Sequence, residues 1–179
     1  MHVDAQKLKQ AVFSAVSETF GAMIFTPIAP AEESGIFSLF PETPESMAEN
    51  QGPDSPESEF RKAKFYQTEI RLISPEKAFF SMIFPGDLAI HITKNLYGWM
   101  EENDPPERII QDSLSEIINT IAGKLMTILL DDQSTFTLSL PNLKSVKNLS
   151  VEGGDIYTYQ TVDNDRFVFI TDWNPLSEK

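Results

Sequence analysis

Apolar residues recur every three or four positions in two long segments of the chain, residues 5–24 and 106–131. This spacing puts apolar side chains on one face of an α-helix. We therefore predict a helix in each segment, the second being the longest of the chain. Pro27 and Pro30 end the first helix, because proline cannot continue one. The apolar face predicted for the second helix comprises Ile110, Leu114, Ile117, Ile121, Leu125 and Ile128.

Two other parts of the chain alternate apolar and polar residues, the pattern of a half-buried β-strand. "KFYQTEIRLI" and "AFFSMIF" flank the turn "SPEK" at 74–77, and "DIYTYQTV" and "RFVFITDW" flank "DND" at 163–165. Each pair predicts a β-hairpin. Two further strands are predicted, one at 136–143, ending at or near Pro141, and one in "SVKNLSV" at 145–151.

A short helix is predicted between the first hairpin and the long helix, in "PGDLAIHITKNLYG". Asp87 is suited to cap its start and Gly98 to end it. The order helix, hairpin, helix, helix, then strands indicates an α+β fold, with helices packed on a mostly antiparallel sheet.

Residues 31–60 differ from the rest in composition. They contain eight acidic residues, four prolines and no Lys or Arg. Such a segment buries little apolar surface, so we predict a single domain over residues 1–179 with an acidic, Pro-rich insertion at about 31–60. The apolar "GIFSLF" at 35–40 could dock elsewhere as a short anchor.

The net charge and the residue composition exclude several kinds of partner and site. The formal net charge is −13 at pH 7, which argues against nucleic acid and anionic membranes as partners. The chain has no Cys and only two His, so thiolate chemistry is excluded and a His-based metal site or triad is hard to build. The polar N-terminus and the short apolar runs predict a cytoplasmic protein.

A polar stripe follows the predicted long helix, on the side opposite its apolar face. Asp112, Glu116, Asn119 and Gly123 are spaced by four, three and four residues, which makes them neighbours along one helix face. The simplest interpretation is a solvated face. However, Asn is a mediocre helix former, and Gly costs about 1 kcal/mol relative to Ala. Glycine also lets another backbone approach closely, so the stripe favours a docking surface.

An acid and an amide on such a surface can assist chemistry that belongs to another molecule. A carboxylate can pair with a partner's lysine, and a carboxamide, which donates and accepts hydrogen bonds, can orient a water molecule. No nucleophile or metal cluster accompanies them. Two hypotheses therefore remain open: a helper that completes another protein's catalytic site, and a non-catalytic interaction module.

The first helix contains a similar phrase, "SAVSETFGAM" at 14–23, which aligns without gaps on "DSLSEIINTI" at 112–121. Ser14 meets Asp112, Glu18 meets Glu116, and Gly21 meets Asn119. Helix followed by hairpin also occurs twice, so we predict an internal pseudo-two-fold repeat. Gly21 has no amide, which makes Ser14, Glu18 and Gly21 a degenerate first copy of the stripe.

The pattern Asp/Ser-x-x-x-Glu-x-x-Asn, followed about twenty residues later by Pro, resembles the CheC/CheX/FliY phosphatases of bacterial chemotaxis. Here it reads Asp112, Glu116, Asn119 and Pro141. "SMIFPGDLAIHITKNLYG" also resembles the strand, helix and glycine that precede the signature helix in the family. The resemblance covers about residues 5–26 and 65–173, and the single complete signature makes it closer to CheX than to CheC.

The resemblance implies an α/β two-layer fold with pseudo-symmetry, and hydrolysis of the aspartyl phosphate of a CheY-type response regulator. Glu116 would pair with the regulator's lysine and Asn119 would orient the attacking water. Asp112, Gly123 and Pro141 would contact the partner. The chain itself would bind no metal or cofactor, because Mg²⁺ would be held by the regulator. A homodimer joined through the sheet is also implied.

Overall fold

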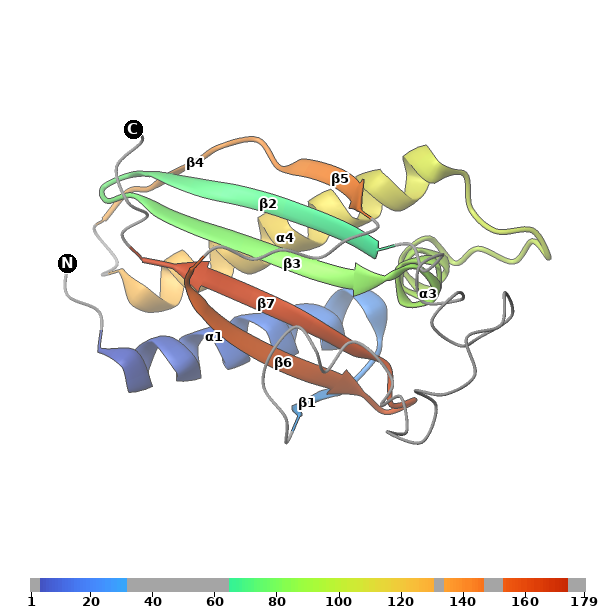
Figure 1. Cartoon of the computed structure of the whole chain (residues 1–179), viewed down its shortest axis with the longest axis horizontal. Coiled ribbons are helices and arrows are strands. Elements are labelled where there is room, and N and C mark those ends of the chain that lie inside the picture. The colour runs from blue at the N-terminus through green and yellow to red at the C-terminus, as the bar shows by residue number, and fades with distance from the viewer. Residues whose placement is uncertain (1–3, 32–64, 131–133, 147–152, 174–179) are drawn as a thin grey trace, which may run out of the picture.

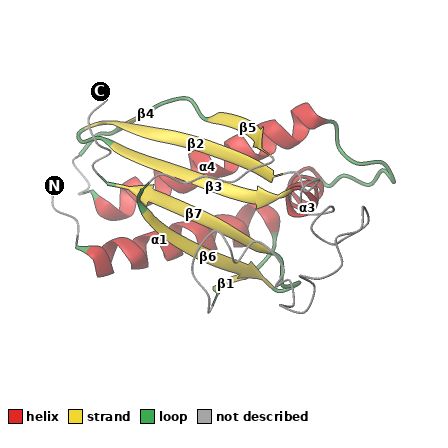
Figure 2. Ribbon diagram, in the orientation of Figure 1, coloured by secondary structure: helices red, strands yellow, loops and turns green. Residues whose placement is uncertain are grey.

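The computed structural model describes residues 4–31, 65–130, 134–146 and 153–173 (Figures 1 and 2). The predicted insertion at about 31–60 lies almost entirely outside these ranges. In chain order the elements are α1 (Ala5–Thr19), the π-helix η1 (Phe20–Ile24), β1 (Ile28–Pro30), β2 (Phe65–Ser74), β3 (Ala78–Pro85), α3 (Gly86–Tyr97), α4 (Glu107–Leu129), β4 (Thr137–Leu138), β5 (Asn142–Val146), β6 (Asp155–Thr161) and β7 (Arg166–Asp172).

The protein has two layers. The strands form one antiparallel sheet, and α1 and α4 lie side by side on one of its faces, running in opposite directions (Figure 1). Apolar side chains from both helices meet those of the sheet in a continuous core. Within it, the rings of Phe20 and Phe167 stack with centroids 4.6 Å apart, and both are fully buried. This is the α+β architecture that the sequence predicts.

The strand order shows the predicted internal repeat. The sheet runs β1-β6-β7-β3-β2-β4, with β5 also paired to β2. The hairpins β2–β3 and β6–β7 meet along β3 and β7, where Ser81 pairs with Ile170. Each half also gives a short strand to the other half, since β1 pairs with β6 and β5 with β2. A pseudo-two-fold axis between β3 and β7 relates the halves, and it also exchanges α1 and α4.

Several predicted boundaries are confirmed and others are wrong. Both hairpins form, and Gly98 ends α3 with a left-handed φ of 59°. Pro85, not Asp87, is the N-cap of α3, because the strand β3 leads directly into the helix. The strand predicted at 136–143 is two short strands, β4 and β5. Of the strand predicted at 145–151, the first two residues end β5, and residues 147–151 lie outside the described residues.

The predicted helical faces are also nearly right. Of the apolar face of α4, only Ile128 is wrong: it is 40% exposed, because the last turn buries Met126 and Leu129 instead. The first helix covers residues 5–24 as predicted, but its last five residues are π-helical, which no periodicity argument indicated.

Candidate functional site

The polar stripe of α4 faces solvent. Asp112, Glu116 and Asn119 are exposed, and Gly123 is partly exposed. Glu116 and Asn119 are one helical turn apart and lie on the side opposite the buried Leu114 and Ile121. Within the described part of the chain, neither side chain makes a hydrogen bond or an ion pair. Both polar groups are therefore available to another molecule.

Contacts to the neighbouring elements hold α4 in place beneath this stripe. Ser113 lies on the buried side of α4, and its hydroxyl is 2.7 Å from that of Thr93 on α3, both residues being fully buried. At the start of the helix, the Tyr66 hydroxyl of β2 donates to the Glu107 carboxylate across 2.8 Å. A helix fixed at both points presents Glu116 and Asn119 on a rigid support.

Gly123 leaves the α4 backbone uncovered on the same stripe. A Cβ built at this position would meet nothing within 4 Å, so its own fold does not require a glycine there. Pro141 is half-buried just before β5, a strand that contacts α4. The residue before it, Leu140, is 89% exposed. The α4 backbone at Gly123 and the Leu140 side chain are therefore both open to solvent.

The first copy differs from the second in chemistry as well as sequence. Glu18 accepts a hydrogen bond from the Ser14 hydroxyl at 2.7 Å and another from Lys124 of α4 at 3.4 Å. The hydrogen bond from Ser14, followed by the interactions with Lys124, lowers the pKa of Glu18. Gly21 lies in η1 and has no side chain to offer. The acid of the first copy is thus occupied and its amide is absent.

Sequence reasoning missed Lys124, because its partner is 106 residues away in the chain. Its position on α4 gave a weak indication of this contact, because Lys124 directly follows Gly123 and so lies at the edge of the stripe, toward a neighbouring helix.

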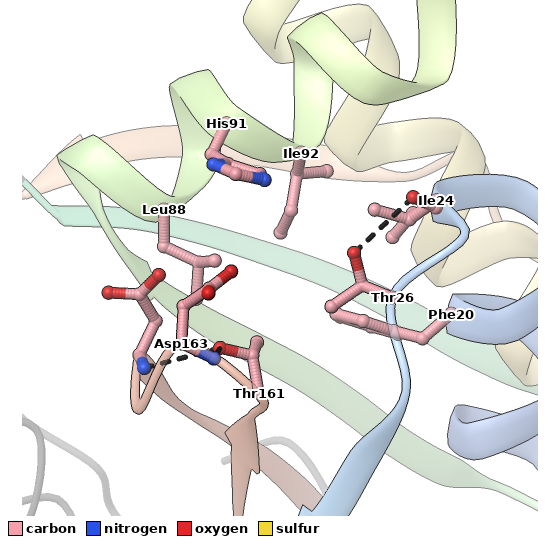
Figure 3. A pocket seen from close by; sticks show the side chains of 9 residues that line it. Phe20, Ile24, Thr26, Leu88, His91, Ile92, Thr161 and Asp163 are labelled. Carbon is pink, nitrogen blue, oxygen red and sulfur yellow. Dashed lines mark hydrogen bonds between the residues drawn. The ribbon is translucent and has the colours of Figure 1, made fainter.

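A second feature of the described surface lies away from the stripe. A shallow depression lies between η1, α3 and the β6–β7 turn, lined by Phe20, Leu88, His91 and Asp163 among others (Figure 3). In the turn at its rim, the Thr161 hydroxyl accepts hydrogen bonds from the backbone N–H groups of Asp163 and Asp165. The described residues include no group of three His, Asp or Glu placed to hold a metal ion.

The fold and the stripe define a class of protein: a two-layer α+β domain whose polar groups are displayed on a helix rather than enclosed in a pocket. Comparison with known proteins identifies the family. The sequence profile described as "Chemotaxis phosphatase CheX" matches residues 68–160. The chain therefore belongs to the CheX family of chemotaxis phosphatases. No curated protein sequence matches it.

Solved structures share the fold at low sequence identity. CheX from Vibrio vulnificus has a TM-score of 0.65 and 14% identity, with 95% of this chain and 100% of that chain covered. A CheX from Desulfovibrio desulfuricans has a TM-score of 0.63 and 12% identity, covering 93% and 98%. The Borrelia burgdorferi CheX–CheY–BeF3–Mg²⁺ complex has a TM-score of 0.60 and 14% identity, covering 95% and 97%.

None of the described helices is both long and apolar enough to span a membrane.

Proposed function

We propose that this protein hydrolyses the aspartyl phosphate of a CheY-type response regulator. The observation that carries the proposal is the pair Glu116 and Asn119, which are exposed, without internal partners among the described residues, and one turn apart on α4. Membership of the CheX family supports it. So does the similar fold of the Borrelia CheX, which was solved with CheY, BeF3 and Mg²⁺.

The reaction requires that the attacking water and the regulator's lysine are held in position, and it needs no covalent intermediate on this protein. Water attacks phosphorus, the bond between phosphorus and the aspartyl oxygen breaks, and the carboxylate leaves with its electron pair, yielding inorganic phosphate and one proton. In this proposal the Asn119 carboxamide accepts a hydrogen bond from the water and aims its lone pair at phosphorus. Glu116 holds the lysine of the regulator by a charge-assisted hydrogen bond. Mg²⁺ belongs to the regulator and offsets charge on the phosphoryl oxygens.

The other two residues of the stripe, together with Pro141, have a supporting role in the same proposal. Gly123 leaves room for the regulator's backbone, while Asp112 and Pro141 border the contact. The first copy contributes no second site, because Glu18 is engaged by Lys124 and Gly21 has no amide. One chain then serves one regulator. A cytoplasmic location follows from such a substrate, and a homodimer joined through the sheet stays a prediction.

The test is to phosphorylate each response regulator encoded in the same genome and to measure loss of the phosphoryl group with and without this protein. At least one regulator should lose phosphate faster. The phosphatase proposal fails if no regulator does. A partner that still binds when Glu116 and Asn119 are both replaced by Ala, without any phosphatase activity, would instead establish the non-catalytic interaction module.

A further inference from the structure

Phe25 combines two unfavourable features at one position. Its side chain is 78% exposed, although it is a large aromatic ring. Its backbone has a φ of 58°, in the left-handed region that a residue with a Cβ adopts only at some cost. A glycine would satisfy the backbone better and would expose no apolar surface. Residues held in such sparsely populated backbone regions cluster at functional sites.

The register of the two helices indicates how far along α4 the end of η1 reaches. Lys124 contacts Glu18, and α1 and α4 are antiparallel (Figure 1). Seven residues separate Glu18 from Phe25, which is at most about 10 Å along the helix axis, because five of the residues form the π-helix η1 and rise less than those of an α-helix. The same distance along α4, measured from Lys124 toward its N-terminus, reaches the turn that carries Glu116 and Asn119. Phe25 is therefore level with the acid–amide pair.

Neighbouring contacts fix this end of η1. The Phe25 N–H donates to the Phe20 carbonyl. The buried Ile24 and Thr26 on either side of it border the depression against α3 (Figure 3). The helix α3 is in turn joined to α4 by the hydrogen bond between Thr93 and Ser113. Because the residues before and after Phe25 are anchored, its ring is presented to solvent from a rigid backbone.

We propose that Phe25 is the apolar anchor by which this protein docks the phosphorylated receiver domain of its regulator, next to the polar contacts of Glu116 and Asn119. This inference rests on the proposed function. The occupant follows from the chemistry of the stripe, which displays the carboxylates of Asp112 and Glu116 and so suits a partner with a lysine at its own active site. An exposed aromatic beside such charges resembles the anchor of an interface.

A docking residue and a catalytic residue differ in kinetics. Phe25→Ala should raise the KM for the phosphorylated regulator about tenfold, as expected for loss of an aromatic anchor, while kcat stays within twofold. Phe25→Gly should do the same, and it suits the positive φ, so it keeps the test valid if the Ala variant folds poorly. Ile73→Ala is the matched control. Ile73 is 56% exposed but lies at the hairpin end of β2, on the sheet face opposite the helices, and its loss should change neither constant.

The outcomes separate this inference from the proposed function. A wild-type KM in both Phe25 variants overturns the docking role while the phosphatase proposal stands. If the wild type accelerates no regulator, binding to regulators loaded with beryllium fluoride and Mg²⁺ is measured instead. Weaker binding by the Phe25 variants then supports docking without catalysis. Equal binding by wild type and variants, or no binding by the wild type, overturns it.

Discussion

Lys124 of α4 donates a hydrogen bond to Glu18 of α1 at 3.4 Å, whereas Glu116, the corresponding acid of the second half, has no such partner among the described residues. The two halves are related by the strand order of the sheet, yet their acids are in different states. The helices explain the difference. The α-helical part of α1 ends at Thr19, while α4 continues to Leu129 and so brings a lysine to Glu18. One acid is paired with a lysine of the same chain, and the other is left for a partner.

The lowered pKa of Glu18 predicts that the stability of the fold depends on pH. Its pKa is lowered by the Ser14 hydroxyl first and by Lys124 second. A lowered folded-state pKa means that the stabilisation is present above the ordinary pKa and is lost as pH falls through the lowered one. We expect Ser14→Ala and Lys124→Met each to raise the pKa of Glu18, as followed by NMR titration of its side chain. An unchanged pKa in both variants would contradict the pairing.

Glu116→Gln keeps the size of the side chain and removes its charge. If the carboxylate holds a lysine of the regulator, its loss should slow dephosphorylation about tenfold or more, the magnitude of a charge-assisted hydrogen bond. The acceleration by the wild type should also fall as salt is added, and that by the variant should fall less. A variant with the same rate and the same salt dependence as the wild type would remove Glu116 from the mechanism.

Gly123→Ala should separate stability from function. The added Cβ meets nothing within 4 Å, and alanine is favoured over glycine inside a helix by up to about 1 kcal/mol. We therefore expect a higher midpoint of urea unfolding together with weaker binding of the regulator, because the methyl group projects into the docking surface. If binding is unchanged while stability rises, the glycine has no part in partner contact.

Phe20→Ala tests the core beneath the site. Phe20 is fully buried and stacked on Phe167, so its truncation should lower the free energy of unfolding by about 3–5 kcal/mol. Phe13 on the same helix is 37% exposed, and Phe13→Ala serves as the matched control with a much smaller loss. Equilibrium urea denaturation gives both values. Similar losses at the two positions would show that the packing described between α1 and the sheet is incorrect.

Much of the fold follows from local patterns. The alternation in residues 65–84 and 155–172 predicts two hairpins that form, and the 3.6-residue period predicts α1 and α4. These signals are local because each element buries one face of its own. The exposed positions of Glu116 and Asn119 follow from the same period, since residues opposite a buried face must point to solvent.

Other features depend on contacts between distant residues and leave no local pattern. β1 contains Pro30 and only three residues, and it is a strand because β6 is there to pair with it. The π-helical turn and the left-handed Phe25 likewise reflect packing of η1 against α3. The contact between Glu18 and Lys124 depends on how two helices are placed side by side, which neither helix encodes alone.

The most direct test of the account is the maximal rate of regulator dephosphorylation by Asn119→Ala. Because Asn119 is exposed and makes no hydrogen bond with another described side chain, the variant should unfold at the wild-type urea concentration and bind the phosphorylated regulator as well as the wild type. Its rate at saturating regulator should nevertheless fall by about 100-fold or more, toward the regulator's own decay, because the attacking water is no longer aligned. A maximal rate equal to that of the wild type would contradict the central claim that this amide positions the water.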